Sequence, residues 1–315
     1  MSVGVHTLRV SNKGVDLETY APETLNGAKL LGVYAPGSAE WHSERSNGVG
    51  GSEVGTILGL NPYESAYALW AKKTGKIESQ IKETWAIRFG KAFESPILGL
   101  WAEEHPEYEV FETGTYQDEE VEYLHANPDA IARHRETGEL KIVEVKTGRN
   151  TWPEVPAAYT AQVLHYMGVM KIKSGVIVAV AGMTWNEYEV PFSQGMINVQ
   201  REAIRQFWSC VVNDRRPEWD GSDSTYQVVR QENPEIELRE VELGDLGKEL
   251  IKAQLHAENA TQGLTQLKSQ VMHQMGKAKW GTVKIDNGES LRVTSRQLRA
   301  GTPVLVINKE GKIWI

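Results

Sequence analysis

The chain is poor in cysteine and has no long apolar run. Cys210 is the only cysteine in 315 residues, which excludes an intrachain disulfide and a cysteine-ligated zinc or iron–sulfur site within one chain. The longest strongly apolar run, residues 176–181, is too short to span a membrane. The first ten residues lack the charged and apolar segments of a signal peptide. We therefore expect no membrane partner, no iron–sulfur cluster and a cytoplasmic location.

The sequence also lacks a phosphate-binding loop and an excess of positive charge. No Gly-x-x-x-x-Gly-Lys-Ser/Thr segment occurs, so no ATP requirement is expected. The net charge of −8 counts against nucleic acid as a partner, although a basic groove can coexist with an acidic exterior. Basic residues gather around the motif described next, and for most of them solvated surface charge is the alternative: Arg88, Lys91, Arg133, Arg135, Lys141, Lys146 and Arg149.

The most informative pattern is Asn127-Pro128-Asp129 followed fifteen residues later by Glu144-Val145-Lys146. Residues 130–135 and 140–147 are predicted to be strands joined by a turn. Side chains alternate along a strand, so Glu144 and Lys146 continue one apolar face while aliphatic residues occupy the other. Aliphatic residues on both faces indicate a central strand. Buried charges need a partner or a metal ion.

A hairpin would bring Asp129 beside Glu144. Two carboxylates a few ångströms apart repel each other unless a cation lies between them. Carboxylate oxygens are hard ligands that suit Mg²⁺ or Mn²⁺ rather than zinc. The pattern therefore indicates a metal-dependent nuclease. A solvated cross-strand ion pair formed by Glu144 and Lys146 is the alternative reading of the same residues.

The remaining periodicities predict an α/β or α+β fold with a mixed central sheet flanked by helices. Helices are expected over residues 52–59, with Ser52 as N-cap, and over 65–73, 84–104, 156–170 and 193–213. Strands are expected over residues 121–126, 176–181 and 187–192. In the 84–104 helix, Glu94 lies at the edge of an apolar stripe that is expected to face the core: Trp85, Phe89, Phe93, Ile97 and Trp101.

The chain is expected to divide into an N-terminal arm (1–40), a main domain (41–220), a linker (221–240) and a C-terminal helical and β extension (241–315). The extension contains a heptad seam with apolar positions spaced by four and three. The seam could join subunits, or belong to a helix packed on its own domain or in a helical hairpin. Its members are Leu246, Leu250, Ala253, Ala257, Ala260, Leu264, Leu267 and Val271.

Six sequence blocks in order, between about residues 41 and 215, resemble the YqaJ-like viral recombinase nucleases. These are phage double-strand exonucleases related to lambda exonuclease, in the PD-(D/E)XK nuclease superfamily. Together the blocks are far more specific than any one of them. They lie at residues 50–63, 69–75, 89–94, 126–130, 144–147 and 162–167.

The resemblance implies roles for individual residues in the metal site. Asp129 and Glu144 would be direct metal ligands, together with the main-chain carbonyl of Val145. Lys146 would orient or activate the attacking water. Glu94 would complete the acidic site through a second metal or by holding Lys146.

Three further positions follow from the same blocks. Gln162 would position Lys146 or the metal-bound water. Arg45 and Ser52 would receive the 5′-terminal phosphate of the DNA. Glu53 stands where the family often has Asp.

The activity implied is a Mg²⁺-dependent 5′-to-3′ double-stranded DNA exonuclease that leaves 3′ single-stranded overhangs for phage-type recombination. Two divalent ions about 4 Å apart can activate water, stabilise charge and assist the leaving group. The resemblance also implies a toroidal trimer acting on duplex ends, a single-strand-annealing partner, and a phage or prophage protein in the host cytoplasm. The alternatives are a repair, restriction or CRISPR-adaptation endonuclease of the same fold, and an inactive DNA-binding scaffold.

Overall fold

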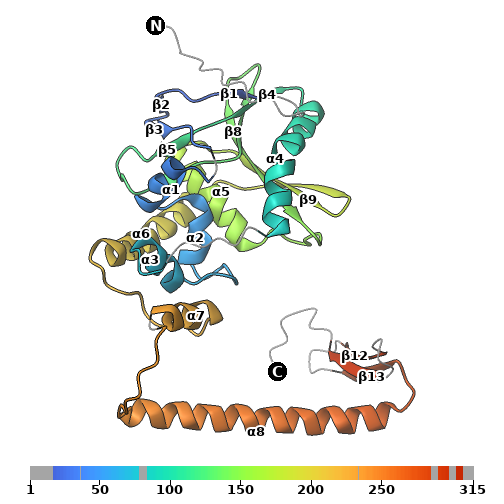
Figure 1. The fold of residues 1–315 in the computed structure, drawn as a ribbon. Helices are drawn as coiled ribbons and strands as arrows, with labels where there is room; N and C mark the ends of the chain where they lie inside the picture. Colours follow the sequence, from blue (N-terminus) through green and yellow to red (C-terminus); the bar gives the residue numbers. More distant parts are fainter. Residues whose placement is uncertain are drawn as a thin grey trace. The chain divides into compact units, whose positions relative to one another are not determined.

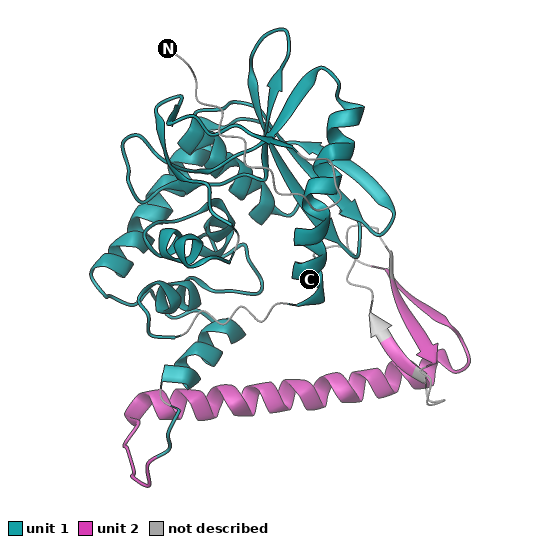
Figure 2. Ribbon diagram, turned by 45° about the horizontal axis from the view of Figure 1, so that its top comes forward, with its two compact units in different colours: residues 1–236 teal, residues 237–315 magenta. Residues whose placement is uncertain are grey.

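The computed structural model describes residues 17–35, 37–77, 84–232, 234–284, 290–297 and 303–307. It divides the chain into two compact units, Met1–Ile236 and Glu237–Ile315 (Figure 2). The boundary between them falls inside the expected 221–240 linker. Residues 1–16 and 36 of the expected N-terminal arm lie outside the described residues.

The centre of unit 1 is a mixed six-stranded sheet in the order β1-β4-β7-β8-β9-β10 (Figure 1). β7 and β8 form an antiparallel hairpin, whereas β8 and β9 run parallel. The expected mixed sheet flanked by helices is thereby confirmed. The strands are β1 (Glu18–Thr19), β4 (Tyr108–Glu112), β7 (Ala130–His134), β8 (Leu140–Gly148), β9 (Gly175–Ala181) and β10 (Thr184–Glu189).

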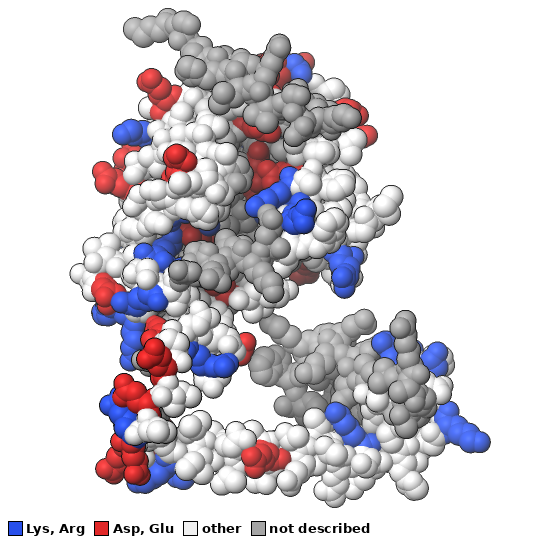
Figure 3. All heavy atoms as spheres, in the orientation of Figure 1, with Lys and Arg blue, Asp and Glu red and all other residues white. Residues whose placement is uncertain are grey.

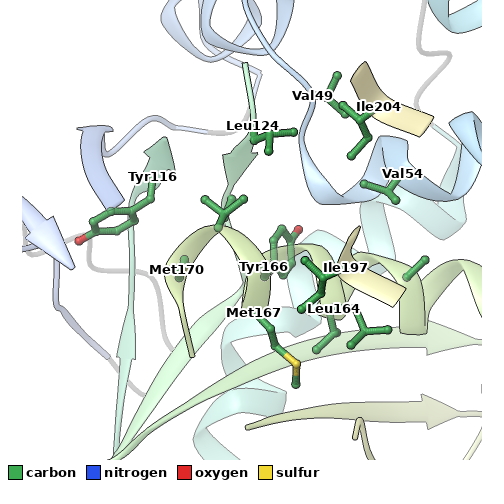
Figure 4. Close-up of a cluster of buried hydrophobic side chains, with 14 of the residues drawn as sticks. Val49, Val54, Tyr116, Leu124, Leu164, Tyr166, Met167, Met170, Ile197 and Ile204 are labelled. Carbon is green, nitrogen blue, oxygen red and sulfur yellow. The ribbon is translucent and has the colours of Figure 1, made fainter. Parts of the chain in front are cut away.

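β8 lies between two hydrophobic clusters, as its alternating pattern predicts. Ile142 belongs to the larger cluster, part of which is drawn in Figure 4. Val143 and Val145 point to the opposite face and join the smaller cluster. The strand is therefore covered on both faces, and Glu144, which shares the face of Ile142, is carried into the interior.

Helix α4 (Trp85–Glu104) covers one face of the sheet, and α5 (Ala157–Met170) connects β8 to β9 across the other (Figure 1). Thr84 caps α4 by accepting a hydrogen bond from the main-chain N–H of Ile87. The helices α2 (Gly51–Ile57), α3 (Ala66–Lys73) and α6 (Gln194–Val212) pack on the α5 side. Helix α1 (Ala39–Ser46) precedes them.

The expected apolar stripe of α4 is only half correct. Ile97 and Trp101 are buried against the sheet, but Trp85, Phe89 and Phe93 are 74%, 39% and 46% exposed. The difference arises because only the C-terminal half of α4 lies over the aliphatic face of the sheet. Its N-terminal half reaches the end of β8, where Gly90 lies near Thr147.

Three other expectations need correction. The expected 121–126 strand is reduced to β6 (His125–Ala126), because the Asp118 carboxylate accepts from the N–H groups of Glu120 and Val121 and holds a turn there. The expected 187–192 strand begins earlier, as β10. β6 closes a four-stranded sheet with β2 (Thr24–Leu25), β3 (Ala28–Gly32) and β5 (Thr115–Gln117).

Part of the expected linker is a helix, α7 (Asp223–Glu232). Its packing on α3 includes polar contacts. The Thr225 hydroxyl donates to Ser65 Oγ at 2.8 Å, and the Tyr67 hydroxyl donates to Glu232 at 2.9 Å. The composition of this segment indicated a linker, but its few apolar residues include Val228, which is buried in the larger cluster.

Unit 2 consists of the long helix α8 (Gly244–Met275) and a three-stranded antiparallel sheet. The strands are β11 (Trp280–Lys284), β12 (Ser290–Gln297) and β13 (Pro303–Ile307). Within the described structure no residue of α8 is buried, and the seam residues Leu246, Leu250 and Leu267 are exposed. The packing of this helix on its own domain is therefore not seen, and the oligomer seam stays a prediction. No described helix is long and apolar enough to cross a membrane.

Candidate active site

Asp129 directly precedes β7, and its carboxylate lies beside β8. The pairing of β7 with β8 begins at Ala130 opposite Val143. Val145 lies two residues further along β8, opposite Pro128. The N–H of Val145 donates to Asp129 Oδ2 at 2.7 Å. This hydrogen bond holds the aspartate carboxylate beside β8.

Glu144 is 1% exposed, although it carries a carboxylate. Its Oε1 accepts hydrogen bonds from Lys146 Nζ at 2.5 Å and from Gln162 Nε2 at 2.6 Å. Its Oε2 is buried without a hydrogen-bond partner among the described residues. A buried carboxylate oxygen without a partner is costly, and a bound cation would satisfy it.

Lys146 is an ammonium group in this arrangement. Burial disfavours its charge, but the carboxylates of Glu144 and Asp129 outweigh that effect and raise the pKa of Lys146 above its ordinary value. The ammonium also lies 5.2 Å from the ring centroid of Tyr159 on α5. Lys146 therefore stays protonated at neutral pH beside the two carboxylates.

The carboxylates themselves are pushed toward protonation. Burial and then the charge of Glu144 raise the pKa of Glu94 to about 7, against a smaller opposing effect of Lys146. Burial and then the charges of Glu144 and Glu94 raise the pKa of Asp129 well above its ordinary range. Three acidic groups from α4, the β7 end and β8 thus share one electrostatic environment.

These residues fit a divalent cation in donor type and in charge. Asp129 and Glu144 offer hard oxygen atoms, and Oε2 of Glu144, which has no partner among the described residues, is the oxygen that a cation would satisfy most directly. In the described part of the chain, however, no three His, Cys, Asp or Glu side chains are already grouped closely enough to hold an ion. An ion would have to complete its coordination from main-chain carbonyls, water or substrate.

Arg45 and Ser52 meet, as their expected shared role requires. Arg45 Nη2 donates to Ser52 Oγ at 3.1 Å, and its guanidinium lies 4.8 Å from the ring centroid of Trp41. Both residues line a cavity of about 500 Å³ together with Lys73. A hydroxyl and a guanidinium in one cavity suit a phosphate group.

Two details of this cavity differ from expectation. Gly50, not Ser52, is the N-cap of α2, so the hydroxyl of Ser52 is exposed and does not close the helix. Glu53 takes that task, since its Oε2 accepts from the N–H of Gly50 at 3.0 Å. Its Oε1 pairs with Lys73 at 3.0 Å and lies 3.4 Å from Arg45. Glu53 therefore orients the two cations of the cavity.

Tyr166 joins the cavity to the buried carboxylate. Gln162 Nε2 donates to the Tyr166 hydroxyl at 2.9 Å as well as to Glu144. On its other side the Tyr166 ring packs on Gly51, next to Ser52. The close packing of α2 on α5 thus fixes the position of the Arg45 cavity relative to Glu144.

The expected basic cluster is largely neutralised by neighbouring acids. Arg133 and Arg135 both pair with Glu109, at 2.6 and 3.0 Å. Lys141 pairs with Glu189 at 2.7 Å. For Arg133 and Arg135 the alternative of solvated surface charge is correct, whereas the Lys141 side chain is only 14% exposed. Arg88 instead lies over the exposed ring of Trp85, at 5.7 Å from its centroid.

Several residues of the site were not identified from the sequence. Lys73 is one, because its role depends on a fold that bonds it to the carbonyls of Arg45 and Gly48. The Tyr166 packing had a usable signal, since Gly51 and Gly55 are four apart and face α5 together. His165, in contrast, is a structural residue that contacts the main-chain carbonyl of His125 at 2.9 Å.

Comparison with known proteins agrees with the motif blocks. Residues 40–176 match the model of the YqaJ-like viral recombinase domain. Protein YqaJ of Bacillus subtilis (strain 168) is 26% identical over 261 residues, covering 78% of this chain and 80% of YqaJ. Protein D345L of African swine fever virus (strain Badajoz 1971 Vero-adapted) is 39% identical over 57 residues, or 18% of this chain and 16% of D345L.

A similar solved structure is that of an alkaline exonuclease from Laribacter hongkongensis. It superposes with a TM-score of 0.48 at 16% identity, covering 56% of this chain and 94% of the exonuclease.

Proposed function

We propose that this chain, whose residues 40–176 belong to the YqaJ-like viral recombinase family, is a metal-dependent deoxyribonuclease that hydrolyses phosphodiester bonds. The observation that carries the proposal is Glu144. Its side chain is buried, one oxygen has no partner among described residues, and Asp129 and Lys146 stand beside it. The solvated ion pair does not account for a glutamate in this position.

Asp129, Glu144 and the carbonyl of Val145 would hold Mg²⁺ or Mn²⁺, with Glu94 close enough to affect a second ion. When bound, the metal supplies positive charge at the phosphate and lowers the pKa of water. Gln162 fixes the orientation of Glu144, and the N–H of Val145 fixes that of Asp129. These contacts preorganise the ligands, which reduces the rearrangement needed during the reaction.

Lys146 contributes as a cation. Its raised pKa favours the ammonium form, which stabilises negative charge on an attacking hydroxide or on the phosphate oxygens. Glu94, with a pKa of about 7, can accept or release a proton near neutral pH.

We further propose a 5′-to-3′ exonuclease that acts on duplex ends and leaves a 3′ single strand. The Arg45 guanidinium and the exposed Ser52 hydroxyl would receive the 5′-terminal phosphate. Tyr166 lies between this cavity and Glu144. A 5′-phosphate bound in the cavity would therefore place the neighbouring phosphodiester bond near Glu144. An endonuclease would need no such end-binding cavity.

Assembly and partner follow as proposals from the family. A toroidal trimer would gather basic residues such as Arg88, Lys91 and Arg149 toward a channel and leave acidic faces outside. The 3′ strand would pass to a single-strand-annealing protein, and the α8 seam is available for either contact. Light scattering that finds a monomer, together with processive digestion, would argue against the ring.

The decisive experiment compares end-labelled linear duplex carrying a 5′-phosphate, the same duplex with a 5′-hydroxyl, and a covalently closed circle. Phosphorylated ends should be digested fastest and the circle not at all. Arg45→Gln and Ser52→Ala should remove the preference for phosphate. Arg133→Gln, which removes an arginine outside the cavity, is the matched control. Cleavage of the circle would favour the endonuclease, and no metal-dependent cleavage of any substrate would favour the inactive scaffold.

A further inference from the structure

The C-terminal part of the chain carries positive charge that the proposed nuclease site does not use. Residues 259–315 hold nine of the 34 Lys and Arg residues but only three of the 42 Asp and Glu, so their net charge is +6 in a chain of −8. On the side that Figure 3 presents, the described charged residues around the β11–β13 sheet are coloured as Lys and Arg, whereas both signs intermingle on unit 1.

The strand register gathers three of these basic residues on one face of the sheet. Trp280 lies opposite Thr294, and Thr282 lies opposite Arg292. Directly opposed residues point to the same side, and side chains alternate along each strand. Trp280, Lys284, Arg292 and Arg296 therefore share a face. The other face carries Val283, Val293 and Leu305.

An exposed tryptophan lies at the edge of this charged face. Trp280 is 55% exposed, with Lys279 Nζ 4.8 Å and Arg292 Cζ 5.6 Å from its ring centroid. Lys279, Lys284, Arg292 and Arg296 are exposed as well, and within the described residues of unit 2 none of them is paired with a carboxylate. The indole is thus more than half exposed, among cations that are themselves exposed.

We propose that the Trp280 face of the β11–β13 sheet is a second DNA site, which binds single-stranded DNA. Phosphates complement the four cations, and an unpaired base can stack on the indole, as in sheets that bind single strands without sequence preference. A duplex keeps its bases stacked on each other and cannot use the indole in this way. The inference rests on the proposed function in one respect: the single strand that this site binds would be the 3′ strand left by digestion.

The test measures binding of a fluorescein-labelled oligothymidine to the full-length protein by anisotropy, in EDTA so that no metal-dependent cleavage occurs. We expect Trp280→Ala to weaken binding at least about fivefold, since loss of one stacked base costs about 1–3 kcal/mol. Trp280→Phe should retain most of the affinity. The double variant Lys279→Glu/Arg292→Glu should weaken binding at least about tenfold, because two phosphate contacts are lost. For the same reason the affinity of this variant should not depend more steeply on salt than that of the wild type.

The matched control is Lys252→Glu with Lys268→Glu, which makes the same charge change in unit 2 on α8. The inference is wrong if this control weakens binding as much as the sheet variants do. It is also wrong if Trp280→Ala binds like the wild type. Asp129→Asn should bind oligothymidine normally, so a failure of the nuclease proposal would not be mistaken for a failure of this one.

Discussion

Gly51 lies so close to Tyr166 that a Cβ atom at position 51 would stand 2.4 Å from Cε1 of the ring. The hydroxyl of the same tyrosine accepts from Gln162, which also holds Glu144. The contact between Gly51 of α2 and Tyr166 of α5 therefore helps to determine how far the Arg45–Ser52 cavity lies from the Glu144 carboxylate.

Gly51→Ala should disturb both stability and end recognition. The added methyl must push α2 from α5 or rotate Tyr166, and overpacking of this kind costs about 1–3 kcal/mol. We expect a lower unfolding midpoint in urea and slower digestion of phosphorylated ends. Gly195→Ala is the control, because nothing lies within 4 Å of its added Cβ. Equal effects of the two substitutions would contradict the importance of the contact.

Asp129→Asn and Glu144→Gln should each reduce Mg²⁺-dependent digestion far more than tenfold, which corresponds to about 1.4 kcal/mol in the barrier. In EDTA Asp129→Asn should not unfold at a lower temperature than the wild type, because a neutral amide removes repulsion between buried carboxylates. Glu109→Gln, at a surface ion pair, is the control. Activity within tenfold of the wild type would refute the metal-ligand assignment.

Lys146→Met should abolish turnover but preserve DNA binding. In EDTA it should also destabilise the protein by about 3–5 kcal/mol, because Glu144 loses the cation that compensates its buried charge. Adding Glu144→Gln to this variant should restore most of the stability. Lys141→Met, whose partner Glu189 is 67% exposed, should cost less than about 1 kcal/mol. Urea unfolding of the wild type, the two single variants and the double variant measures these differences and distinguishes a buried pair from a surface pair.

The free energy of unfolding should decrease as the pH falls, and His165 should be one cause. Burial, followed by the charges of Arg201 and His125, lowers the pKa of His165 to about 4 from an unfolded value of about 6.5. The unfolded state therefore binds the proton first as pH falls. The contribution of His165 to the free energy of unfolding is complete above pH 6.5 and is lost as the pH falls toward 4, with a total of about 3 kcal/mol.

His165→Gln should flatten that acid dependence when unfolding free energies are measured in EDTA between pH 7 and 4. Glu94, whose pKa is raised, acts in the opposite direction over part of this range, so the difference between variant and wild type is the informative quantity. His256→Gln, an exposed position on α8, should leave the profile unchanged. Identical profiles for both variants and the wild type would contradict the assignment.

The sequence predicted the environment of β8 correctly because two-residue alternation is a local property. Ile142 on one side and Val143 on the other required only the strand period, and the mixed sheet followed from the order of elements. The hairpin that was expected to bring Asp129 beside Glu144 is present as β7 and β8.

Other features depend on contacts distant in sequence. The exposure of Trp85, Phe89 and Phe93 depends on where α4 extends beyond the aliphatic part of the sheet, which a helical period does not encode. Likewise, α7 is stabilised by Ser65 and Tyr67, more than 150 residues earlier, so composition alone indicated a linker.

The position of β8 between two hydrophobic clusters has a consequence for motion. Local opening of this strand would have to detach it from α4 and α5 at once, so its amide hydrogens at residues 142–145 should exchange with solvent only on global unfolding. Glu144 is carried by that slowest-exchanging segment, whereas Arg45 and Ser52 lie on short helices nearer the surface. Glu144 is thus the least mobile part of the site, and under the proposed function any adjustment to an arriving DNA end would fall to the cavity.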